Sequence, residues 1–239
     1  MMRIVLRLIL FFCLFSQTGQ AIDNLFSTYT LFNEKNGLSS RNIKGIQKDD
    51  EGFFWLATEE DIVRFDGANF IEFKPAGRFF SSESVKKIIR YGQYLFIAYE
   101  EQGLIRMDLN DYSFSLITKL PLADFTLKND NELYWVTKAG VVSRILNGKV
   151  TKSVLIKGNE GQIQFFDNKA FVKTKGGPIY ALTANDLSLV KKILLPSNAN
   201  DETFEVGNEQ LFYLKNKILF GFDSVWNPYQ PPPSTTRNP

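Results

Sequence analysis

A pattern of short apolar strands recurs along the chain at intervals of about forty residues. Runs rich in Phe, Tyr, Ile and Val are separated by Gly, Asn and Asp, which is typical of strands joined by turns. No window of twelve or more residues shows a convincing helical period. Each copy contains a strand centred on an aromatic residue. The centres lie 41, 39, 36 and 41 residues apart, at Trp55, Phe96, Trp135, Phe171 and Phe212.

A fixed period of this length predicts a β-propeller, whose four-stranded blades repeat every ~40–45 residues. An all-β sandwich with evenly spaced strands is the alternative, but five copies in phase favour the propeller. We therefore predict an all-β fold, a β-propeller of about five four-stranded blades, over residues 22–225. The outer strands are predicted at Phe70–Phe73, Tyr112–Ile117, Val150–Ile156 and Ser188–Leu195.

The two ends of the repeat region suggest how a ring of blades would close. The fifth copy ends near Asp223, and a Pro-rich tail follows over residues 226–239. Because proline cannot donate a hydrogen bond to a neighbouring strand, we expect no strand in this tail. The unassigned strand Phe26–Phe32 would then supply the outer strand of the last blade and close a five-blade ring. The alternative is that the chain is part of a larger propeller, and the sequence leaves both open.

Residues 1–21 have the features of a cleaved signal peptide. Arg3 and Arg7 form a positive start, an apolar run covers Leu8–Phe15, and small residues precede a cut after Ala21. The apolar run is shorter than the ~20 residues that a membrane-spanning helix needs. No later stretch approaches that length. We therefore expect a periplasmic protein that is not inserted in a membrane after cleavage.

The composition excludes several classes of chemistry. The chain has no His and one Cys, Cys13, which lies in the signal peptide. Ser-His-Asp or Cys-His catalysis, a phosphorelay histidine and Cys clusters for zinc are therefore excluded. The chain has 28 basic and 26 acidic residues, and removal of Arg3 and Arg7 leaves it neutral. A neutral chain argues against nucleic acid as a partner.

The first copy resembles a known family. Its segment Asn36–Phe73 contains Gly37-Leu38-Ser39-Ser40, Ile43, Ile46, Asp49, Gly52-Phe53-Phe54-Trp55, Thr58, Arg64-Phe65-Asp66-Gly67 and Phe70. With these residues the segment is similar to the two-component regulator propeller repeat, the periplasmic input module of bacterial sensor kinases.

This resemblance implies a sensing function and shows some departures. Ala57 stands where the family usually has Gly, and Glu60-Asp61-Ile62 replaces a turn that usually ends in Gly-Leu. The later copies keep only some of these matching residues. Members of the family usually carry more blades, a smaller β-domain, a membrane helix and a cytoplasmic output domain. We expect this chain to lack those parts and the kinase.

Two groups of residues, aromatic and acidic, are candidates for a binding or catalytic site. Trp55 and Trp135, beside Thr58 and Thr137, could form platforms for sugars, but their recurrence favours packing between blades. The acidic runs could resemble calcium ligands or the carboxylate pair of a glycosidase, but their place in predicted turns favours solvated charges. These runs are Asp49-Asp50-Glu51, Glu59-Glu60-Asp61 and Glu100-Glu101.

The remaining glycines and basic residues carry weaker signals. Four glycines have no phosphate-binding spacing and are predicted in hairpin turns, namely Gly158, Gly161, Gly176 and Gly177. The pairs Lys86-Lys87 and Lys191-Lys192 are not interleaved with aromatic residues as in a nucleic-acid platform. The predicted loop positions of Arg41, Lys74 and Arg78 would let them meet an anionic ligand at one face of the propeller.

The sequence favours a sensing or binding module over an enzyme. We expect no catalytic residues, metal or cofactor, and an unknown small molecule, an oligosaccharide or a membrane signalling protein as the partner. The first alternative is a secreted propeller enzyme, a glycosidase or lyase that uses carboxylates and Tyr. The second is an inactive remnant of a truncated sensor.

Overall fold

The computed structural model describes residues 30–74, 79–80, 84–158, 161–175, 177–194, 204–207, 210–215, 218–222 and 228–229. These residues contain five four-stranded antiparallel sheets, all within the compact unit from Phe32 to Pro239. The first sheet holds β1 (Ile43–Lys48), β2 (Phe54–Thr58), β3 (Ile62–Phe65) and β4 (Phe70–Phe73). The second holds β5 (Val85–Tyr91), β6 (Tyr94–Tyr99), β7 (Gly103–Asp108) and β8 (Phe114–Thr118). The third holds β9 (Leu122–Leu127), β10 (Glu132–Thr137), β11 (Val141–Leu146) and β12 (Lys149–Leu155).

The last two sheets also have four strands each. The fourth holds β13 (Gln162–Phe166), β14 (Lys169–Lys173), β15 (Ile179–Thr183) and β16 (Leu189–Ile193). The fifth holds β17 (Phe204–Gly207), β18 (Gln210–Lys215), β19 (Ile218–Phe222) and β20 (Pro228–Tyr229). A single 3₁₀ turn, η1 (Glu34–Asn36), precedes the first sheet in the described residues; the Asn33 side chain caps its start and Gly37 ends it at a φ of 94°.

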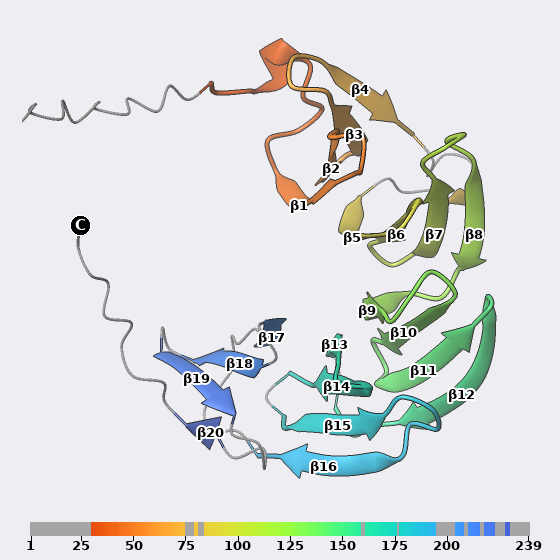
Figure 1. Ribbon diagram of the computed structural model, residues 1–239, viewed down its shortest axis with the longest axis vertical. Coiled ribbons are helices and arrows are strands. Elements are labelled where there is room, and N and C mark those ends of the chain that lie inside the picture. Colours follow the sequence, from red (N-terminus) through yellow and green to blue (C-terminus); the bar gives the residue numbers. More distant parts are fainter. Residues whose placement is uncertain are drawn as a thin grey trace, which may run out of the picture. The chain divides into compact units, whose positions relative to one another are not determined.

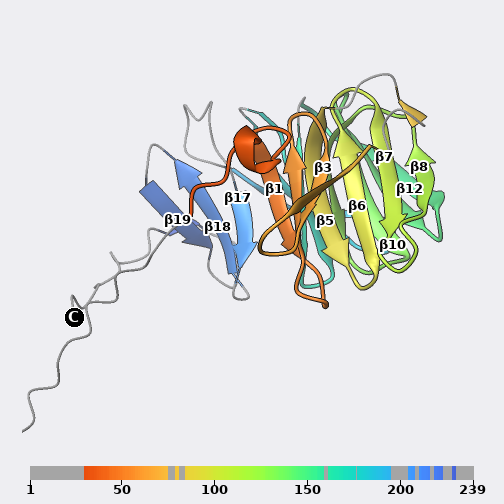
Figure 2. The ribbon, with the colours of Figure 1, turned by 90° about the horizontal axis from the view of Figure 1, so that it is seen from above.

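Every sheet is an up-and-down meander in which each strand pairs with the next one along the chain. Consecutive sheets contact one another through their first strands, from β1 to β5, β9, β13 and β17. Figure 1 shows these first strands on the inner side of their sheets, and Figure 2 shows neighbouring strands, such as β17 and β18, running in opposite directions. The prediction of a β-propeller with four-stranded blades is confirmed.

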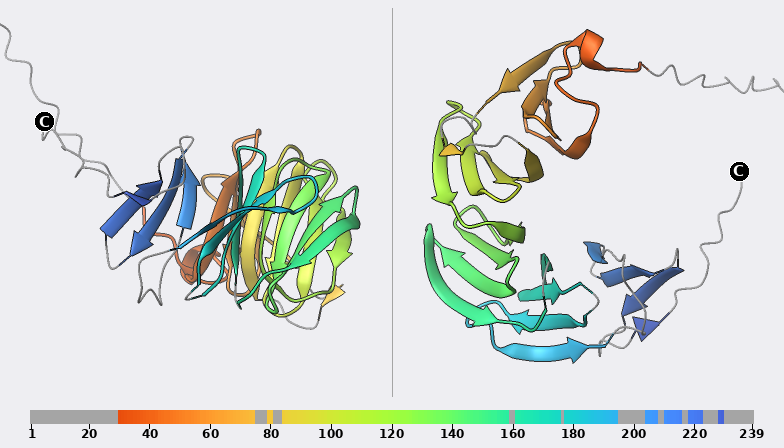
Figure 3. Two further views of the ribbon diagram at one scale, coloured as in Figure 1. Left: turned by 90° about the horizontal axis from the view of Figure 1, so that it is seen from below. Right: turned by 180° about the vertical axis from the view of Figure 1, so that it is seen from behind.

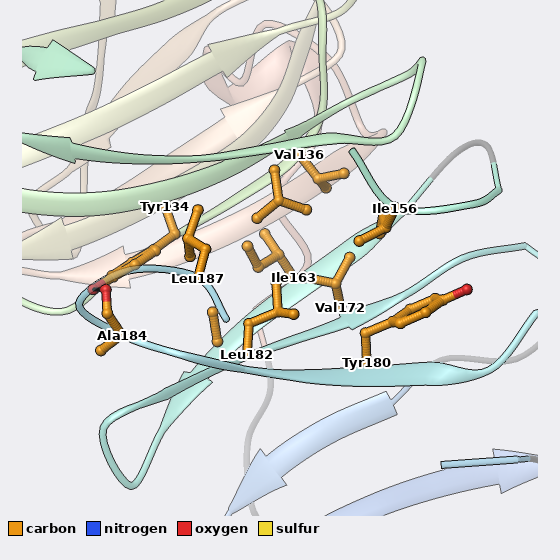
Figure 4. Packing of buried hydrophobic residues seen from close by; sticks show 11 residues of the cluster. Tyr134, Val136, Ile156, Ile163, Val172, Tyr180, Leu182, Ala184 and Leu187 are labelled. Carbon is orange, nitrogen blue, oxygen red and sulfur yellow. Dashed lines mark hydrogen bonds between the residues drawn. The ribbon is translucent and has the colours of Figure 1, made fainter. Parts of the chain in front are cut away.

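Three apolar clusters fill the spaces between neighbouring sheets. One joins the first sheet to the second through Trp55 and Leu95, and another joins the second to the third through Phe96 and Phe125. The cluster of the third and fourth sheets contains Tyr134, Ile163, Leu182 and Leu187 (Figure 4). The first four sheets therefore bury the faces that they turn toward one another, as stacked repeats do.

The aromatic centre of the third sheet differs from the prediction by one residue. Trp55 pairs with Arg64, Phe96 with Arg106 and Tyr134 with Arg144 across β2–β3, β6–β7 and β10–β11. Tyr134, and not Trp135, is thus the counterpart of Trp55. Because side chains alternate between the faces of a strand, Trp135 instead packs against the second sheet. Both tryptophans are buried in packing, as predicted, with exposed fractions of 0 % and 3 %.

The outer strand of the fifth sheet comes from the Pro-rich tail. β20 pairs with β19, with Pro228 opposite Phe222 and Tyr229 opposite Gly221. The expectation that this tail holds no strand is therefore wrong. A proline is tolerated in an edge strand because it needs a partner on only one side. Phe32 lies outside any strand and packs its ring 4.9 Å from that of Phe65, and residues 26–29 of the proposed closing strand lie outside the described residues.

Substitution of Gly103 with alanine is expected to lower the free energy of unfolding by about 2–4 kcal/mol. Gly103 opens β7 with a φ of 117°, and a Cβ there would lie 2.1 Å from the Thr118 carbonyl oxygen. Urea unfolding followed by Trp fluorescence measures the change. Gly92→Ala is the matched control, because its φ is 56° and a Cβ there has nothing within 4 Å. An equal cost at both positions would contradict the packing argument.

Candidate functional site

Two of the three basic residues predicted to meet an anion, Arg41 and Lys74, pair with different carboxylates of the protein. Arg41 Nε donates to Glu34 Oε1 at 2.8 Å. Lys74 Nζ lies 3.6 Å from a carboxylate oxygen of Asp61 and 3.4 Å from one of Glu72. Arg78 lies outside the described residues. Arg41 and Lys74 each pair with a carboxylate of the protein, and both side chains remain largely exposed, at 74 % and 61 %.

Two of the acidic residues expected to be solvated are structural instead. Asp61 is 1 % exposed, so its prediction as a solvated turn charge is wrong. Asp49 accepts hydrogen bonds from the Phe53 amide and from Trp55 Nε1, both at 2.8 Å. Glu59, Glu60 and Glu101 are exposed as predicted. Among the described residues, no group of three or more His, Cys, Asp or Glu side chains is placed to hold a metal ion.

Lys86 and Lys87 make contacts within the protein, and the described glycines lie in turns or connections. Lys87 Nζ pairs with Asp124 Oδ1 at 2.7 Å, and Lys86 Nζ donates to the Leu122 carbonyl at 3.2 Å. Gly177 lies in the β14–β15 turn as predicted, but Gly158 and Gly161 lie in the connection between the third and fourth sheets, which corrects their assignment to hairpins. Gly176 lies outside the described residues. The two threonines also stabilise turns: Thr58 Oγ1 accepts from the Asp61 amide at 2.9 Å, and Thr137 Oγ1 from the Val141 amide at 3.1 Å.

The candidate site is a cleft of about 320 Å³ between the second and third sheets. Its apolar part is formed by Phe96 and Leu133, which are 1 % and 4 % exposed. Its polar part is formed by Arg106 of β7, Asp130 and Asn131 of the β9–β10 turn, and Asn147 of the β11–β12 turn. Figure 3 shows the outer strand of the second sheet beside the green strands of the third. The volume is at the lower end of the ~300–1,000 Å³ typical of small-molecule pockets.

Arg106 belongs to a set of arginines that recurs on the third strand of three sheets. Arg64, Arg106 and Arg144 each point toward the following sheet, alongside the aromatic residue paired with them. Arg64 hydrogen-bonds to the Tyr112 hydroxyl. Arg144 donates to Glu132 Oε1 at 2.7 Å and to the Asn185 carbonyl at 3.3 Å. Two of the three guanidiniums therefore have a polar partner from the following sheet, although Arg64 Nε is buried without a hydrogen bond.

Arg106 differs from these two arginines in its surroundings. Its guanidinium carbon lies 4.4 Å from the centre of the Tyr94 ring, a cation–π contact that orients the group. Within the part of the chain that the structure describes, its guanidinium makes no ion pair and no hydrogen bond. Its N–H groups are therefore available in the cleft.

The cleft exists because one turn is short. The turns after the third strands of the second and fourth sheets span residues 109–113 and 184–188, with the sequences Leu-Asn-Asp-Tyr-Ser and Ala-Asn-Asp-Leu-Ser. Each inserts an apolar side chain toward the preceding sheet, Tyr112 in one case and Leu187 in the other, and both residues have a φ of 57°. In the third sheet the corresponding turn is only Asn147-Gly148. No side chain from this turn joins the cluster between the second and third sheets, and the space next to Arg106 stays open.

A second hollow of about 220 Å³ lies along the first strands of the second, third and fourth sheets. It is lined by Lys86, Ala123, Lys138, Gly161 and Gln162. Its two cations are already engaged, because Lys86 donates to a backbone carbonyl and Lys138 pairs with Glu101. The cleft beside Arg106 is larger and offers a cation without a protein partner among the described residues, so it is the stronger candidate.

The sheets resemble those of extracellular sensor domains. The extracellular domain of the hybrid two-component system BT3049 from B. thetaiotaomicron matches with a TM-score of 0.66 at 22 % identity, over 84 % of this chain and 31 % of that one. The extracellular domain of the one-component system BT4673 from the same bacterium gives a TM-score of 0.67 at 15 % identity, over 85 % of this chain and 32 % of that one. PorZ, a surface component of the type-IX secretion system of Porphyromonas gingivalis, matches with a TM-score of 0.62 at 13 % identity, over 84 % of this chain and 28 % of PorZ.

These likenesses define the class of fold. At such identities they show the fold, a multi-bladed β-propeller of the kind found in extracellular sensor domains. The chain spans about a third of the length of these relatives. It matches no protein-family model and no curated protein. None of the helical segments in the described ranges is long and apolar enough to cross a bilayer.

Proposed function

We propose that the protein is a periplasmic propeller that binds a small polar molecule and serves in signal recognition without catalysing a reaction. The cleft between the second and third sheets carries this proposal, because it combines an apolar floor with an oriented Arg106 that is free for a ligand. Pockets of this composition, mostly preformed and with few polar groups, are typical of ligand sites. The resemblance of Asn36–Phe73 to the two-component regulator propeller repeat and the likeness to extracellular sensor domains support a sensing role.

The signal peptide predicted from the sequence of residues 1–21 supports a periplasmic location. A protein exported in this way would meet small molecules that cross the outer membrane and could report them to a membrane signalling protein. Such a partner is part of the proposal, since the sensor relatives are parts of longer signalling systems.

A glycosidase or lyase is the second candidate function. Its usual chemistry needs two carboxyl groups that flank the bond to be broken. Among the described residues that line the cleft, Asp130 is the one carboxylate. This favours binding over hydrolysis at that place.

Isothermal titration of the purified protein with amino acids, neutral sugars, sugar acids and peptidoglycan fragments tests the proposal. We expect saturable heat with at least one class of compound, and no new product when the mixture is later analysed by chromatography. Absence of heat with every compound, together with no crosslinked partner in periplasmic extracts, would refute the binding function. Product formation that is lost in Asp130→Asn would instead favour the enzyme.

A further inference from the structure

The cleft holds one positive and one negative group that do not neutralise each other. Arg106 and Asp130 both line it, yet they form no ion pair with each other. Asp130 Oδ1 accepts a hydrogen bond from Asn131 Nδ2 at 3.1 Å, which is a neutral donor. Among the described residues, no Lys or Arg side chain pairs with Asp130. The cleft therefore presents two separated charges of opposite sign.

The other recurring arginines show that this arrangement is specific to the cleft. In the first and third sheets the arginine is met by a tyrosine hydroxyl or a carboxylate of the protein. Arg106 stacks on Tyr94 much as Arg64 stacks on Phe53, but it faces the open cleft and has no polar partner for its guanidinium among the described residues. The N–H groups of a guanidinium lie in the plane of the group, so stacking of that plane on an aromatic ring leaves them free at its edge. Two of them can then bind the two oxygens of one carboxylate.

We propose that the cleft binds a small zwitterion, an α-amino acid with an apolar side chain. This inference rests on the proposed ligand-binding function and names the ligand class. The ligand carboxylate would pair with Arg106 and the ligand ammonium with Asp130. The apolar side chain would cover Phe96 and Leu133, which form the floor. The Asn147 amide borders the same space and can hydrogen-bond to the ligand's polar atoms.

The ligand chemistry predicts a graded set of affinities. L-Leucine carries both charges, N-acetyl-L-leucine lacks the ammonium, and L-leucinamide lacks the carboxylate. Each derivative is expected to bind at least roughly ten-fold more weakly than leucine by isothermal titration, because a hydrogen bond to a charged group is lost. Galacturonate, which carries a carboxylate and hydroxyl groups but no ammonium, is expected to bind more weakly than leucine.

Two variants assign each ligand charge to its residue. Arg106→Gln is expected to weaken leucine roughly ten-fold or more and to remove the preference for leucine over leucinamide. Asp130→Asn is expected to remove the preference for leucine over N-acetyl-leucine. Arg41→Gln and Glu51→Gln are the controls, because they change the net charge by the same amounts at exposed positions away from the cleft. Both controls should bind leucine as the unmodified protein does.

A third variant tests the cleft itself. Replacing Asn147-Gly148 with the sequence of residues 109–113 would give the third sheet the turn that fills the cleft between the first and second sheets. Leucine binding should be lost while the cooperative thermal transition is kept. If this variant unfolds, Asn147→Leu, which brings apolar bulk to the rim, takes its place and should weaken binding.

The outcomes separate the inference from the function on which it rests. If leucine does not bind but galacturonate or another compound does, and Arg106→Gln abolishes that binding, the zwitterion is wrong and the binding function stands. If leucine binds equally well to Arg106→Gln and Asp130→Asn, the assigned site is wrong. If no compound binds, the proposed function fails together with the inference.

Discussion

Replacing Trp55 with alanine is expected to lower the free energy of unfolding by about 3–5 kcal/mol, the range for a large aromatic residue removed from a core. Trp55 is 0 % exposed and lies in the cluster between the first and second sheets. Its ring centre lies 5.1 Å from that of Phe73 and 6.1 Å from that of Tyr112. The substitution leaves a cavity between two sheets, so both lose packing at once. Urea unfolding at constant temperature measures the effect.

Two further variants separate packing from hydrogen bonding at this position. Trp55→Phe keeps most of the ring contacts but removes the 2.8 Å bond from Nε1 to Asp49 Oδ2, and we expect a loss of about 1–3 kcal/mol. Phe54→Ala is the control on the same strand, because Phe54 is 40 % exposed and on the other face. A cost at Phe54 as large as the cost at Trp55 would contradict the burial of Trp55 between sheets.

The period of the sequence predicted the blades because it reflects a physical need. A four-stranded sheet cannot bury both of its faces alone, so each repeat must carry apolar residues on both. Strands β1 and β4 have the predicted bounds. The register was harder to predict: Tyr134 and Trp135 are adjacent large aromatics, and both are buried, one on each face. Only the pairing of Tyr134 with Arg144 shows which of them matches Trp55.

The candidate site is not evident from the sequence for a different reason. The cleft results from a missing side chain in a short turn, and not from a motif of aromatic or charged residues. The signal was present, since the Asn-Asp-apolar-Ser sequence at 109–113 and 184–188 has no equivalent at Asn147-Gly148. This difference in sequence predicts a cleft only once it is known that the turn after the third strand contacts the preceding sheet. Ion pairs such as Arg41 with Glu34, seven residues apart in a loop, also depend on a backbone path that no repeat pattern predicts.

A buried ionic network links the third sheet to the fourth, and Glu132 is at its centre. The Glu132 side chain is 6 % exposed and accepts hydrogen bonds from Arg144 Nε at 2.7 Å and from the Tyr134 hydroxyl at 2.6 Å. Lys128 Nζ lies 3.1 Å from its other oxygen. The Tyr134 hydroxyl also lies 2.9 Å from the Ala184 carbonyl oxygen of the fourth sheet. Glu132→Ala is expected to cost about 3–5 kcal/mol of unfolding free energy, because two cations lose their buried counterion.

The stabilisation by Glu132 should also depend on pH in a defined direction. Burial raises the pKa of Glu132, but the hydrogen bonds from Arg144, Tyr134 and Lys128 outweigh it, so its pKa lies below the usual 4.5. A carboxyl group with a lowered pKa in the folded state stabilises the fold above its unfolded pKa, and this contribution is lost as the pH falls through the folded value. The difference in unfolding free energy between the unmodified protein and Glu132→Gln should therefore be full at pH 7 and smaller at pH 3. Glu51→Gln, at an exposed turn position, should show little difference at either pH. A Glu132→Gln difference that stays constant from pH 7 to pH 3 would mean that the charge of Glu132 contributes nothing to holding these two sheets together.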